Sequence, residues 1–209
     1  MEYINLELAR LADEAIASKK RIIVHLDTHL SIALMLGYHL DSKYGGLDIT
    51  VVQKTFTGKL LWRANAELIR TYQEPLWKIE EELYIIDGTD IALSISVTHD
   101  IRHDVNGHIS GMLSTVSKAV HWVISPKVGS ASIKDASHIV AAIEELIRGI
   151  RSQKRQFAAA SRIHLFLAAP NAFAFYLGQR LKPMGEVTLY EFDFENQRDG
   201  GYHAIIKIP

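Results

Sequence analysis

The 209-residue chain contains no cysteine, so it has no disulfide bond, no thiolate metal ligand and no cysteine nucleophile. It also lacks a charge imbalance, because 23 Lys and Arg residues face 24 Asp and Glu residues. A net charge of −1 argues against a protein that coats nucleic acid through a basic surface. A small phosphorylated ligand is compatible with this composition, because it needs only a few cations.

Long apolar runs and targeting signals are missing as well. No uninterrupted apolar run reaches the length of a membrane span, and the N-terminal residues lack the basic and apolar regions of a signal peptide. We therefore expect a chain without a membrane segment that works in the cytoplasm, in agreement with the absence of cysteine. Hydrophobic residues make up 48% of the sequence, enough for one large domain or two small halves that share a core.

A similar pattern occurs twice, 141 residues apart. Each copy has an apolar strand, then a helical run containing Leu-Gly, then a β-rich segment. The matching segments are residues 22–28, 36–37 and 47–55 in the first copy and residues 163–169, 177–178 and 188–194 in the second. A strand–helix–strand unit used twice predicts two related α/β halves. Their loops after the strands are expected to surround one crevice, where open α/β sheets bind ligands.

Hydrophobic periodicity over the rest of the chain alternates between helix and strand. Helices are predicted at residues 6–18, 28–40, 132–156 and 171–182, and residues 59–79 are predicted to be mostly helical, with an end or kink near Pro75. Strands are predicted at 21–26, 47–55, 83–86, 91–98, 121–125, 163–169, 188–194 and 202–208. This alternation favours an α/β fold with a largely parallel sheet, helices on its faces and an antiparallel pair at the C-terminus.

Two polar residues follow each other closely at the end of the first predicted strand. His25 and Asp27 are two residues apart, so they share a face of the strand, and Asp27 could orient His25 as in a catalytic pair. No Gly-x-Ser-x-Gly elbow supplies a matching nucleophile. We therefore favour a ligand-contact or capping role for Asp27.

Histidines cluster between residues 98 and 108. His99 and His103 have the spacing with which two histidines share a metal on a helix. His99 follows a strand and precedes a predicted turn, so that spacing has no helix to act on. We favour hydrogen-bonded loop histidines over a metal site.

The turn Ala168-Ala169-Pro170 joins a buried strand to a helix that we expect Asn171 to cap. Its small residues let a ligand approach the backbone, and free N–H groups at the helix start favour an anion or a purine edge. Pro170 is equally a plain way to begin a helix.

Cations and an aromatic ring lie together in residues 54–63. Trp62 can stack on a base, and Arg63 or Lys54 can neutralise a phosphate. The alternative is that Trp62 is a core residue, because its spacing fits an apolar helical stripe. The three glutamates at 80–82 are expected to form a solvated face.

Several of these segments together resemble the SAVED family. They are residues 95–101, 104–105, 163–172, 175–178 and 187–194. The resemblance covers about residues 20–209 and implies a single SAVED domain over residues 1–209, with pseudo-halves at about 1–118 and 119–209. Its implied fold is α/β, with two pseudo-symmetric CARF-like, Rossmann-like halves whose mostly parallel sheets are flanked by helices.

The resemblance also implies a function. SAVED domains sense cyclic oligonucleotide messengers in bacterial antiphage (CBASS) signalling, so the expected ligand is a cyclic di- or trinucleotide such as a cGAMP or cyclic triadenylate. No other cofactor, no metal and no catalytic activity is implied for the domain itself. Ligand binding is expected to drive homo-oligomerisation and to switch on an effector: an HNH-type nuclease, a TIR NADase, a transmembrane pair or a protease. We recognise no effector segment, so an excised sensor and a standalone sensor with a separate effector both fit.

The ligand site implied by the resemblance combines the strand-end residues already described. They are His25, Asp27, Lys54, Trp62, Arg63, Thr98, His99, Ala168, Ala169 and Pro170. Two other hypotheses stay open. A ring nuclease would use His25, His99 and Lys54 on a ribose hydroxyl or phosphate, and an interaction domain would have no nucleotide site.

Overall fold

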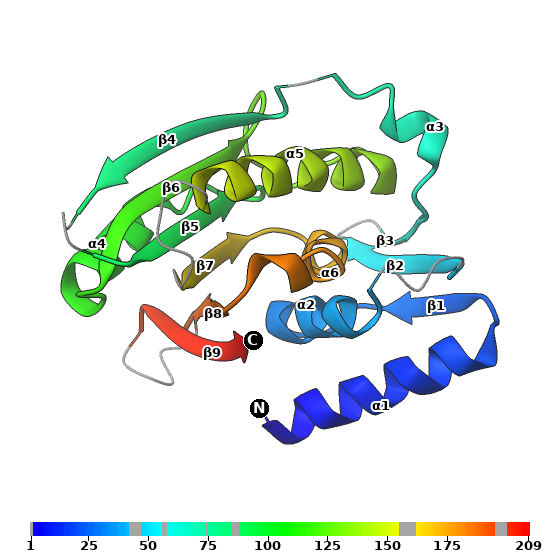
Figure 1. Ribbon diagram of the computed structural model, residues 1–209. Coiled ribbons are helices and arrows are strands. Elements are labelled where there is room, and N and C mark those ends of the chain that lie inside the picture. Colours follow the sequence, from blue (N-terminus) through cyan, green and yellow to red (C-terminus); the bar gives the residue numbers. More distant parts are fainter. Residues whose placement is uncertain are drawn as a thin grey trace. The chain divides into compact units, whose positions relative to one another are not determined.

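The computed structural model describes residues 2–41, 47–55, 58–73, 75–84, 88–154, 162–194 and 200–209. The helices and strands, in chain order, are α1 Glu2–Ser18, β1 Ile22–His25, α2 Leu30–His39, β2 Ile49–Thr55, β3 Gly58–Trp62, α3 Ala66–Ile69, β4 Trp77–Leu83, β5 Asp90–Ser96, α4 Arg102–Met112, β6 Val116–Ile124, α5 Ala136–Lys154, β7 Ile163–Ala168, α6 Asn171–Gly178, the 3₁₀ turn Lys182–Met184, β8 Val187–Phe192 and β9 Tyr202–Ile208 (Figure 1). No helix in these ranges is long and apolar enough to cross a membrane.

The chain forms two compact units, each assembled from three segments. The first unit comprises residues 1–72, 134–143 and 170–183, and the second comprises 73–133, 144–169 and 184–209. Each unit contains segments from before and after residue 118, so the two units differ from the predicted pseudo-halves 1–118 and 119–209. Those pseudo-halves describe a repeat along the sequence, and they stay a prediction.

The first unit contains a three-stranded sheet in the order β1-β2-β3. Strands β1 and β2 are parallel, and β3 runs antiparallel to β2. Helices α2 and α6 pack against each other so closely that a β-carbon on Gly37 would lie 1.9 Å from the carbonyl oxygen of Phe175. A β-carbon on Gly178 would likewise lie 2.0 Å from the carbonyl oxygen of Leu34. The contact is reciprocal, because Leu34 and Phe175 hold equivalent positions in the two copies of the repeat.

The second unit contains a six-stranded sheet in the order β4-β6-β5-β7-β8-β9. The four central strands, β6, β5, β7 and β8, are parallel to one another, and the edge strands β4 and β9 are antiparallel to them. The predicted largely parallel sheet and its C-terminal antiparallel pair are therefore confirmed, with a second antiparallel strand at the opposite edge.

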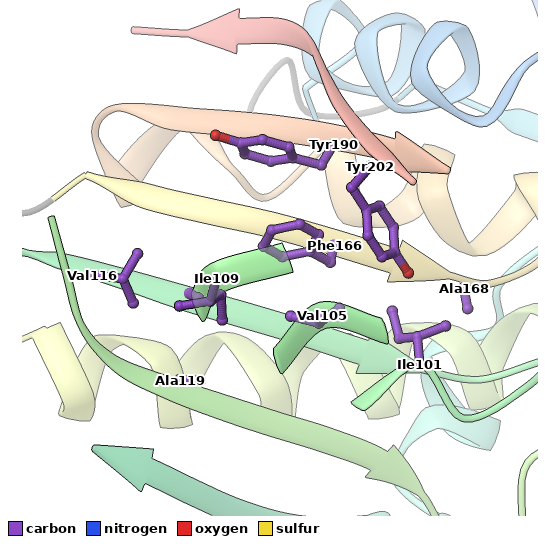
Figure 2. Close-up of a cluster of buried hydrophobic side chains, with 10 residues drawn as sticks. Ile101, Val105, Ile109, Val116, Ala119, Phe166, Ala168, Tyr190 and Tyr202 are labelled. Carbon is purple, nitrogen blue, oxygen red and sulfur yellow. The ribbon is translucent and has the colours of Figure 1, made fainter. Parts of the chain in front are cut away.

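Each face of this sheet is covered by a helix. On one face, Val105 and Ile109 of α4 join Phe166, Tyr190 and Tyr202 from three neighbouring strands (Figure 2). The ring of Phe166 stacks on Tyr190 at 4.7 Å and meets Tyr202 edge-on at 4.9 Å between centroids. These rings bury large apolar areas and place the core directly beneath α4.

Helix α5 packs on the other face of the sheet. Side chains alternate along β6, so Trp122 lies on this face, opposite to Ala119. A β-carbon on Gly149 of α5 would lie 2.1 Å from the Trp122 indole. The apolar stripe that predicted this helix is buried, including Ile139, Ile143 and Leu146.

The internal repeat is present in the backbone. Strands β1 and β7 begin 141 residues apart, at Ile22 and Ile163, and helices α2 and α6 do so at Leu30 and Asn171. In each copy the first strand pairs in parallel with the strand after the helix, and an antiparallel strand follows. The repeat is therefore one strand longer than the sequence pattern indicated.

The prediction for residues 59–79 was wrong. They contain β3, the four-residue α3 and the beginning of β4 rather than a long helix. Cross-strand pairing of Leu61 with Val52 and of Trp62 with Val51 outweighs the helical spacing of the apolar residues. Within the predicted strand 83–86 and helix 132–156, residues 85–86 and 155–156 lie outside the described residues.

Helix α4 was not anticipated. Its sequence contains Gly107 and Gly111, which lower helix propensity, and its apolar stripe is short. Burial of Val105 and Ile109 against the sheet stabilises it instead.

Candidate functional site

Charged residues gather where the parallel strands of the first unit end. The β1–β2 register continues past the strands, because Leu26 N–H donates to Val52 O at 3.3 Å. This places Asp27 opposite Lys54, and their side chains form an ion pair at 3.0 Å. His25 is the last residue of β1, is exposed, and shares a sheet face with Asp27. The structure therefore brings His25, Asp27 and Lys54 together.

Trp62 and Arg63 lie elsewhere in the same sheet. Arg63 Nη2 is 3.0 Å from Asp48 Oδ1, and Asp48 precedes β2, whereas Lys54 is near its other end. Six residues of extended chain correspond to about 20 Å. Trp62 is only 8% exposed, and its carbonyl accepts a hydrogen bond from the Tyr176 hydroxyl. The structure does not bring this pair to Asp27, and the core interpretation of Trp62 fits its burial.

The start of α6 is tied to the loop after β1. The Asn171 amide donates to Leu26 O at 3.1 Å and to Thr28 O at 2.7 Å. Asn171 is the first helical residue, so the prediction that it caps α6 was wrong; the N-cap position is Pro170, which has no side-chain cap. The Ala172 N–H donates to Gln53 Oε1 at 2.9 Å, so Gln53 occupies one donor that an anion was expected to use.

The parallel strands of the second unit have a topological switch point. From β5 the chain passes through α4 to β6 on one side, and then through α5 to β7 on the other side. In such sheets the loops diverge outside the carboxyl ends of the two strands at the switch, here β5 and β7, and ligands bind there. This is the point at which the second unit is best suited to hold a ligand.

Four predicted site residues meet at that switch point. The N–H groups of Val97 and Thr98 both donate to the Ala168 carbonyl, at 2.8 and 2.9 Å. His99 is exposed, and its Nδ1 lies 3.1 Å from the Thr98 hydroxyl. The loop containing Thr98 and His99 is thus held directly beside Ala168 and the Ala169 that follows it.

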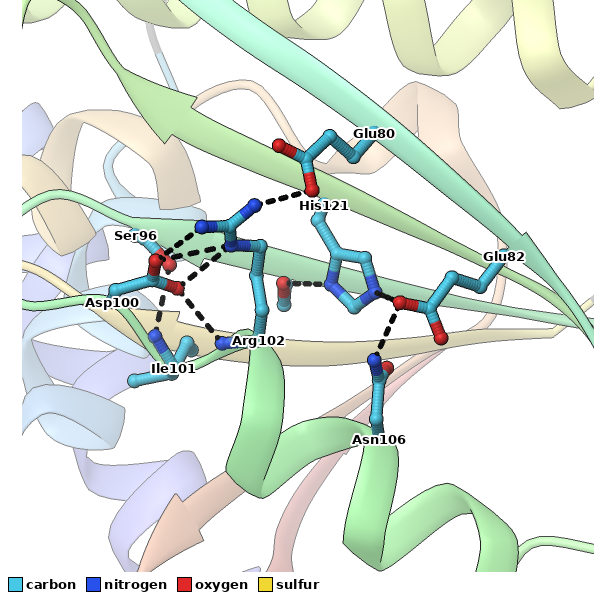
Figure 3. Close-up of polar contacts among 9 residues, drawn as sticks. Glu80, Glu82, Ser96, Asp100, Ile101, Arg102, Asn106 and His121 are labelled. Carbon is cyan, nitrogen blue, oxygen red and sulfur yellow. Dashed lines mark hydrogen bonds and ion pairs between the residues drawn. The ribbon is translucent and has the colours of Figure 1, made fainter.

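An arginine that sequence reasoning missed lies at the beginning of α4 (Figure 3). Arg102 Nη2 is 2.6 Å from Asp100 Oδ2, its Nε is 3.0 Å from both Asp100 oxygens, and its Nη1 donates to Glu80 on strand β4. The Arg102 backbone N–H also donates to Asp100 Oδ1 at 3.1 Å. Hydrogen bonds from Arg102 are the largest cause of the lowered pKa of Asp100. A positive charge in the first turn of a helix interacts unfavourably with the helix dipole. Arg102 at the start of a helix would therefore have indicated, from sequence alone, that acidic residues lie beside it.

A second polar chain lies under α4 (Figure 3). Ser94 Oγ is 2.6 Å from His121 Nδ1, and Glu82 Oε1 is 3.9 Å from His121 Nε2. Asn106 of α4 donates to Glu82 at 2.7 Å. Burial is the largest cause of the lowered pKa of His121. Ser94 and His121 are fully buried, so this pair presents no nucleophile to solvent. The hydrogen bond from Asn106 to Glu82 fastens α4 to strand β4.

The sequence suggested that the three glutamates of β4 form a solvated face, but they also make contacts within the fold. Glu80 and Glu82 contact α4, and Glu81, on the alternate face, is 2.5 Å from Lys118 Nζ. Every glutamate of the run has a partner in the fold.

Comparison with known proteins identifies the family that has this architecture. Residues 4–208 match the SAVED family, described as the SMODS-associated and fused to various effectors sensor domain. The chain belongs to the SAVED family. It is 32% identical over 191 residues to CD-NTase-associated protein 4 of Enterobacter hormaechei subsp. hoffmannii (strain UCI 50), a match that covers 91% of this chain and 37% of that protein.

Solved structures share the SAVED fold. The Acinetobacter baumannii Cap4 SAVED/CARF-domain containing receptor with the cyclic trinucleotide 2′3′3′-cAAA matches with a TM-score of 0.68 and 20% identity, over 94% of this chain and 42% of that one. The same receptor with 3′3′3′-cAAA gives 0.70 and 19%, over 97% and 44%. The Moraxella osloensis Cap4 receptor gives 0.64 and 17%, over 95% and 41%. This chain thus spans less than half the length of each of these relatives.

Within this SAVED domain the predicted site residues fall into separate groups. His25, Asp27 and Lys54 form one group in the first unit, and Thr98, His99, Ala168 and Ala169 form another in the second. Among the residues that the structure describes, no three His, Asp or Glu side chains are placed to hold a metal ion.

Proposed function

We propose that this SAVED domain senses a cyclic di- or trinucleotide messenger in bacterial antiphage signalling. The observation that carries the proposal is the switch point between β5 and β7, occupied by Thr98, His99, Ala168 and Ala169, in a chain of a sensor-domain family. Two structures of the A. baumannii relative are described with cyclic trinucleotides, and the curated relative is named as CD-NTase-associated, which supports this ligand class.

The residues at the two strand ends suit a nucleotide. Thr98 and His99 offer hydrogen-bonding groups, while Ala168 and Ala169 let a flat base or ribose approach the backbone. In the first unit Lys54 is an exposed cation whose pairing with Asp27 is solvent-screened. Such a pair exchanges readily for a phosphate contact, because an exposed ion pair contributes little free energy.

Signalling would follow from differential affinity. If the oligomeric form of this domain binds the messenger more tightly than the monomer, ligand shifts the population toward the oligomer. The effector that this switches on, such as an HNH endonuclease, belongs to a fused segment or a separate chain, and the sensor works in the cytoplasm with no cofactor besides its ligand.

A thermal-shift panel tests the ligand class. We expect 2′3′3′-cAAA, 3′3′3′-cAAA or cGAMP to raise the melting temperature, because a ligand that binds only the native state stabilises it. Linear triadenylate is the matched control, and chromatography of the ligand after incubation separates a sensor from a ring nuclease. A cooperatively melting domain that responds to no cyclic nucleotide contradicts the proposal.

Two single variants ask which end of the first sheet contacts ligand. Lys54→Ala is expected to weaken binding about tenfold, because it removes a cation at the carboxyl ends of β1 and β2. Arg63→Ala removes an equal charge at the opposite end and is expected to have the smaller effect. A larger loss with Arg63→Ala would assign the phosphate contact to the Trp62–Arg63 pair instead.

A further inference from the structure

An aromatic patch, made of the rings of Phe192 and Phe194, lies at the end of β8. Phe192 is 36% exposed and Phe194 is 76% exposed. Their ring centroids are 5.0 Å apart, and Phe192 also meets Tyr202 edge-on at 5.2 Å. Tyr202 is buried in the core beneath α4. The patch is therefore anchored on the core through Phe192, while the ring of Phe194 is open to solvent.

The patch lies at the same sheet edge as the switch point. Strands β7 and β8 are parallel neighbours, and they end at Ala168 and Phe192. Figure 2 shows Ala168 at this edge together with Tyr202, the partner of Phe192 in β9. Strand β8 is two strands from β5, which corresponds to about 10 Å at the usual strand spacing. A nucleotide held by the loop after β5 can therefore reach the patch with its base.

The pairing between β7 and β8 stops before either strand ends. Strand β7 pairs with β5 as far as Ala168, and β8 pairs with β9 as far as Phe192, but β7 and β8 pair only as far as Phe166 and Tyr190. A register shift beside Tyr190 in the β8–β9 pair adds twist at this point. Continued pairing would set Ala168 opposite Phe192, and its single methyl group is too small to cover an aromatic ring.

We propose that the aromatic patch stacks on a base of the cyclic nucleotide, with Phe194 as the contacting ring and Phe192 as its support. An aromatic ring offers a π face on which any nucleobase can stack. Leaving such a ring mostly exposed forfeits hydrophobic free energy, and a stacked base recovers part of it. The assignment rests on the proposed function, and it identifies the side chains that contact the base rather than the phosphate.

Dissociation constants for 2′3′3′-cAAA, 3′3′3′-cAAA and cGAMP, measured by calorimetry, test the assignment. Phe194→Ala is expected to bind about five- to a hundredfold more weakly than wild type, the range expected when one stacking ring is removed. Phe194→Leu should recover only a small part of that loss, because it restores apolar area without the π face. Phe194→Trp should bind at least as tightly as wild type, because the indole offers a larger π face.

Leu83 supplies the matched control in the same sheet. It is 85% exposed and ends β4, which runs antiparallel to β6, so it lies at the opposite edge of the sheet from the patch. Leu83→Ala removes an exposed apolar side chain away from the switch point and should leave the dissociation constants unchanged. Cooperative melting of each variant is checked first.

Fluorescence of an added tryptophan reports the stacking directly. The native residues Trp62, Trp77 and Trp122 are at most 8% exposed. The solvent-exposed indole of Phe194→Trp can therefore be followed by its own emission. Each ligand that binds should quench this emission in Phe194→Trp and leave the emission of Leu83→Trp unchanged.

The outcomes separate this assignment from the proposed function. If wild type binds a ligand and Phe194→Ala or Phe194→Leu binds it equally well, the assignment is wrong while the proposed function stands. If Phe194→Ala binds as wild type does but has a lower molecular mass by light scattering, the patch is instead a contact between copies of this chain. If wild type binds none of the three ligands, both are contradicted.

Discussion

The two copies of the strand–helix–strand repeat have the same backbone plan but different side chains at the end of the first strand. Where the first copy has exposed His25 and Asp27, the second has Phe166 and Ala168, both buried. The helix that follows begins at the equivalent residue in both copies. The difference shows that apolar strands and packed helices set the backbone plan, which leaves the strand-end residues free to specialise.

The strongest similarity between the copies is the contact between α2 and α6. Gly37 meets the backbone of Phe175, and Gly178 meets the backbone of Leu34, so each helix supplies one glycine and one backbone surface. Such an approach excludes any side chain at either glycine. Equivalent positions are therefore expected to be equally sensitive to substitution.

The largest expected effect comes from adding one methyl group at either glycine. Gly37→Ala and Gly178→Ala should each lower the free energy of unfolding by about 3 kcal/mol, because the helices must move apart. Urea denaturation measures both, and the two losses should agree to within about 1 kcal/mol. Gly107→Ala in α4 is the control: nothing lies within 4 Å of the added carbon, so it should stabilise by about 0.5–1 kcal/mol. Unequal losses at Gly37 and Gly178 would break the proposed symmetry of the contact.

An intermediate effect is expected when the pH is lowered, because the two copies differ in whether the equivalent residue is exposed or buried. The second copy places a buried His164 where the first has exposed Ile23. Burial is the largest cause of the lowered pKa of His164, and the same cause lowers the pKa of His108 and His121 in that unit. Below the unfolded pKa of 6.5 the unfolded chain takes up protons that the folded chain resists, so stability falls as pH falls.

We expect the urea midpoint to be lower at about pH 5.5 than at about pH 7.5. His121→Asn removes one histidine that is protonated on unfolding. Its urea midpoint should therefore fall less between these two pH values, although the variant is less stable at neutral pH. An acid-independent midpoint for the wild-type protein would contradict the assignment of these histidines as neutral and buried.

The smallest effect is expected at the charged strand end of the first copy. Asp27→Asn removes the ion pair with Lys54, both of whose side chains are more than half exposed. The free energy of unfolding should change by less than about 1 kcal/mol, because solvent screens such pairs. A larger loss would mean that Asp27 supports the fold, and the contrast between the exposed strand end of the first copy and the buried strand end of the second would no longer separate a specialised residue from a structural one.

The predictable elements were those whose patterns are local. The apolar strands at 22–25 and 163–168 and the helices after them were recognised from their runs of apolar residues and from the Leu-Gly pairs. The α4 helix was not, because burial against Phe166 and Tyr190, rather than its own glycine-containing sequence, stabilises it.

The candidate site was only partly predictable, for a similar reason. Asp27 and Lys54, as well as Thr98 and Ala168, meet because parallel strands end at one edge, which topology implies. One of the two carboxylate partners of Arg102 is Glu80, 22 residues earlier on the edge strand β4, whose beginning the sequence pattern assigned to a helix. The family resemblance implied that Trp62 and Arg63 share a site with Asp27, whereas the hairpin register sets them at the other end of β2.

The alternating glutamates of β4 have one more consequence. Strand β4 is an edge of the six-stranded sheet, and an unpaired edge is a template on which another chain can extend the sheet. A strand added there would run beside three successive carboxylates that point to both faces. The same residues that fasten α4 and pair with Lys118 therefore discourage aggregation through this edge.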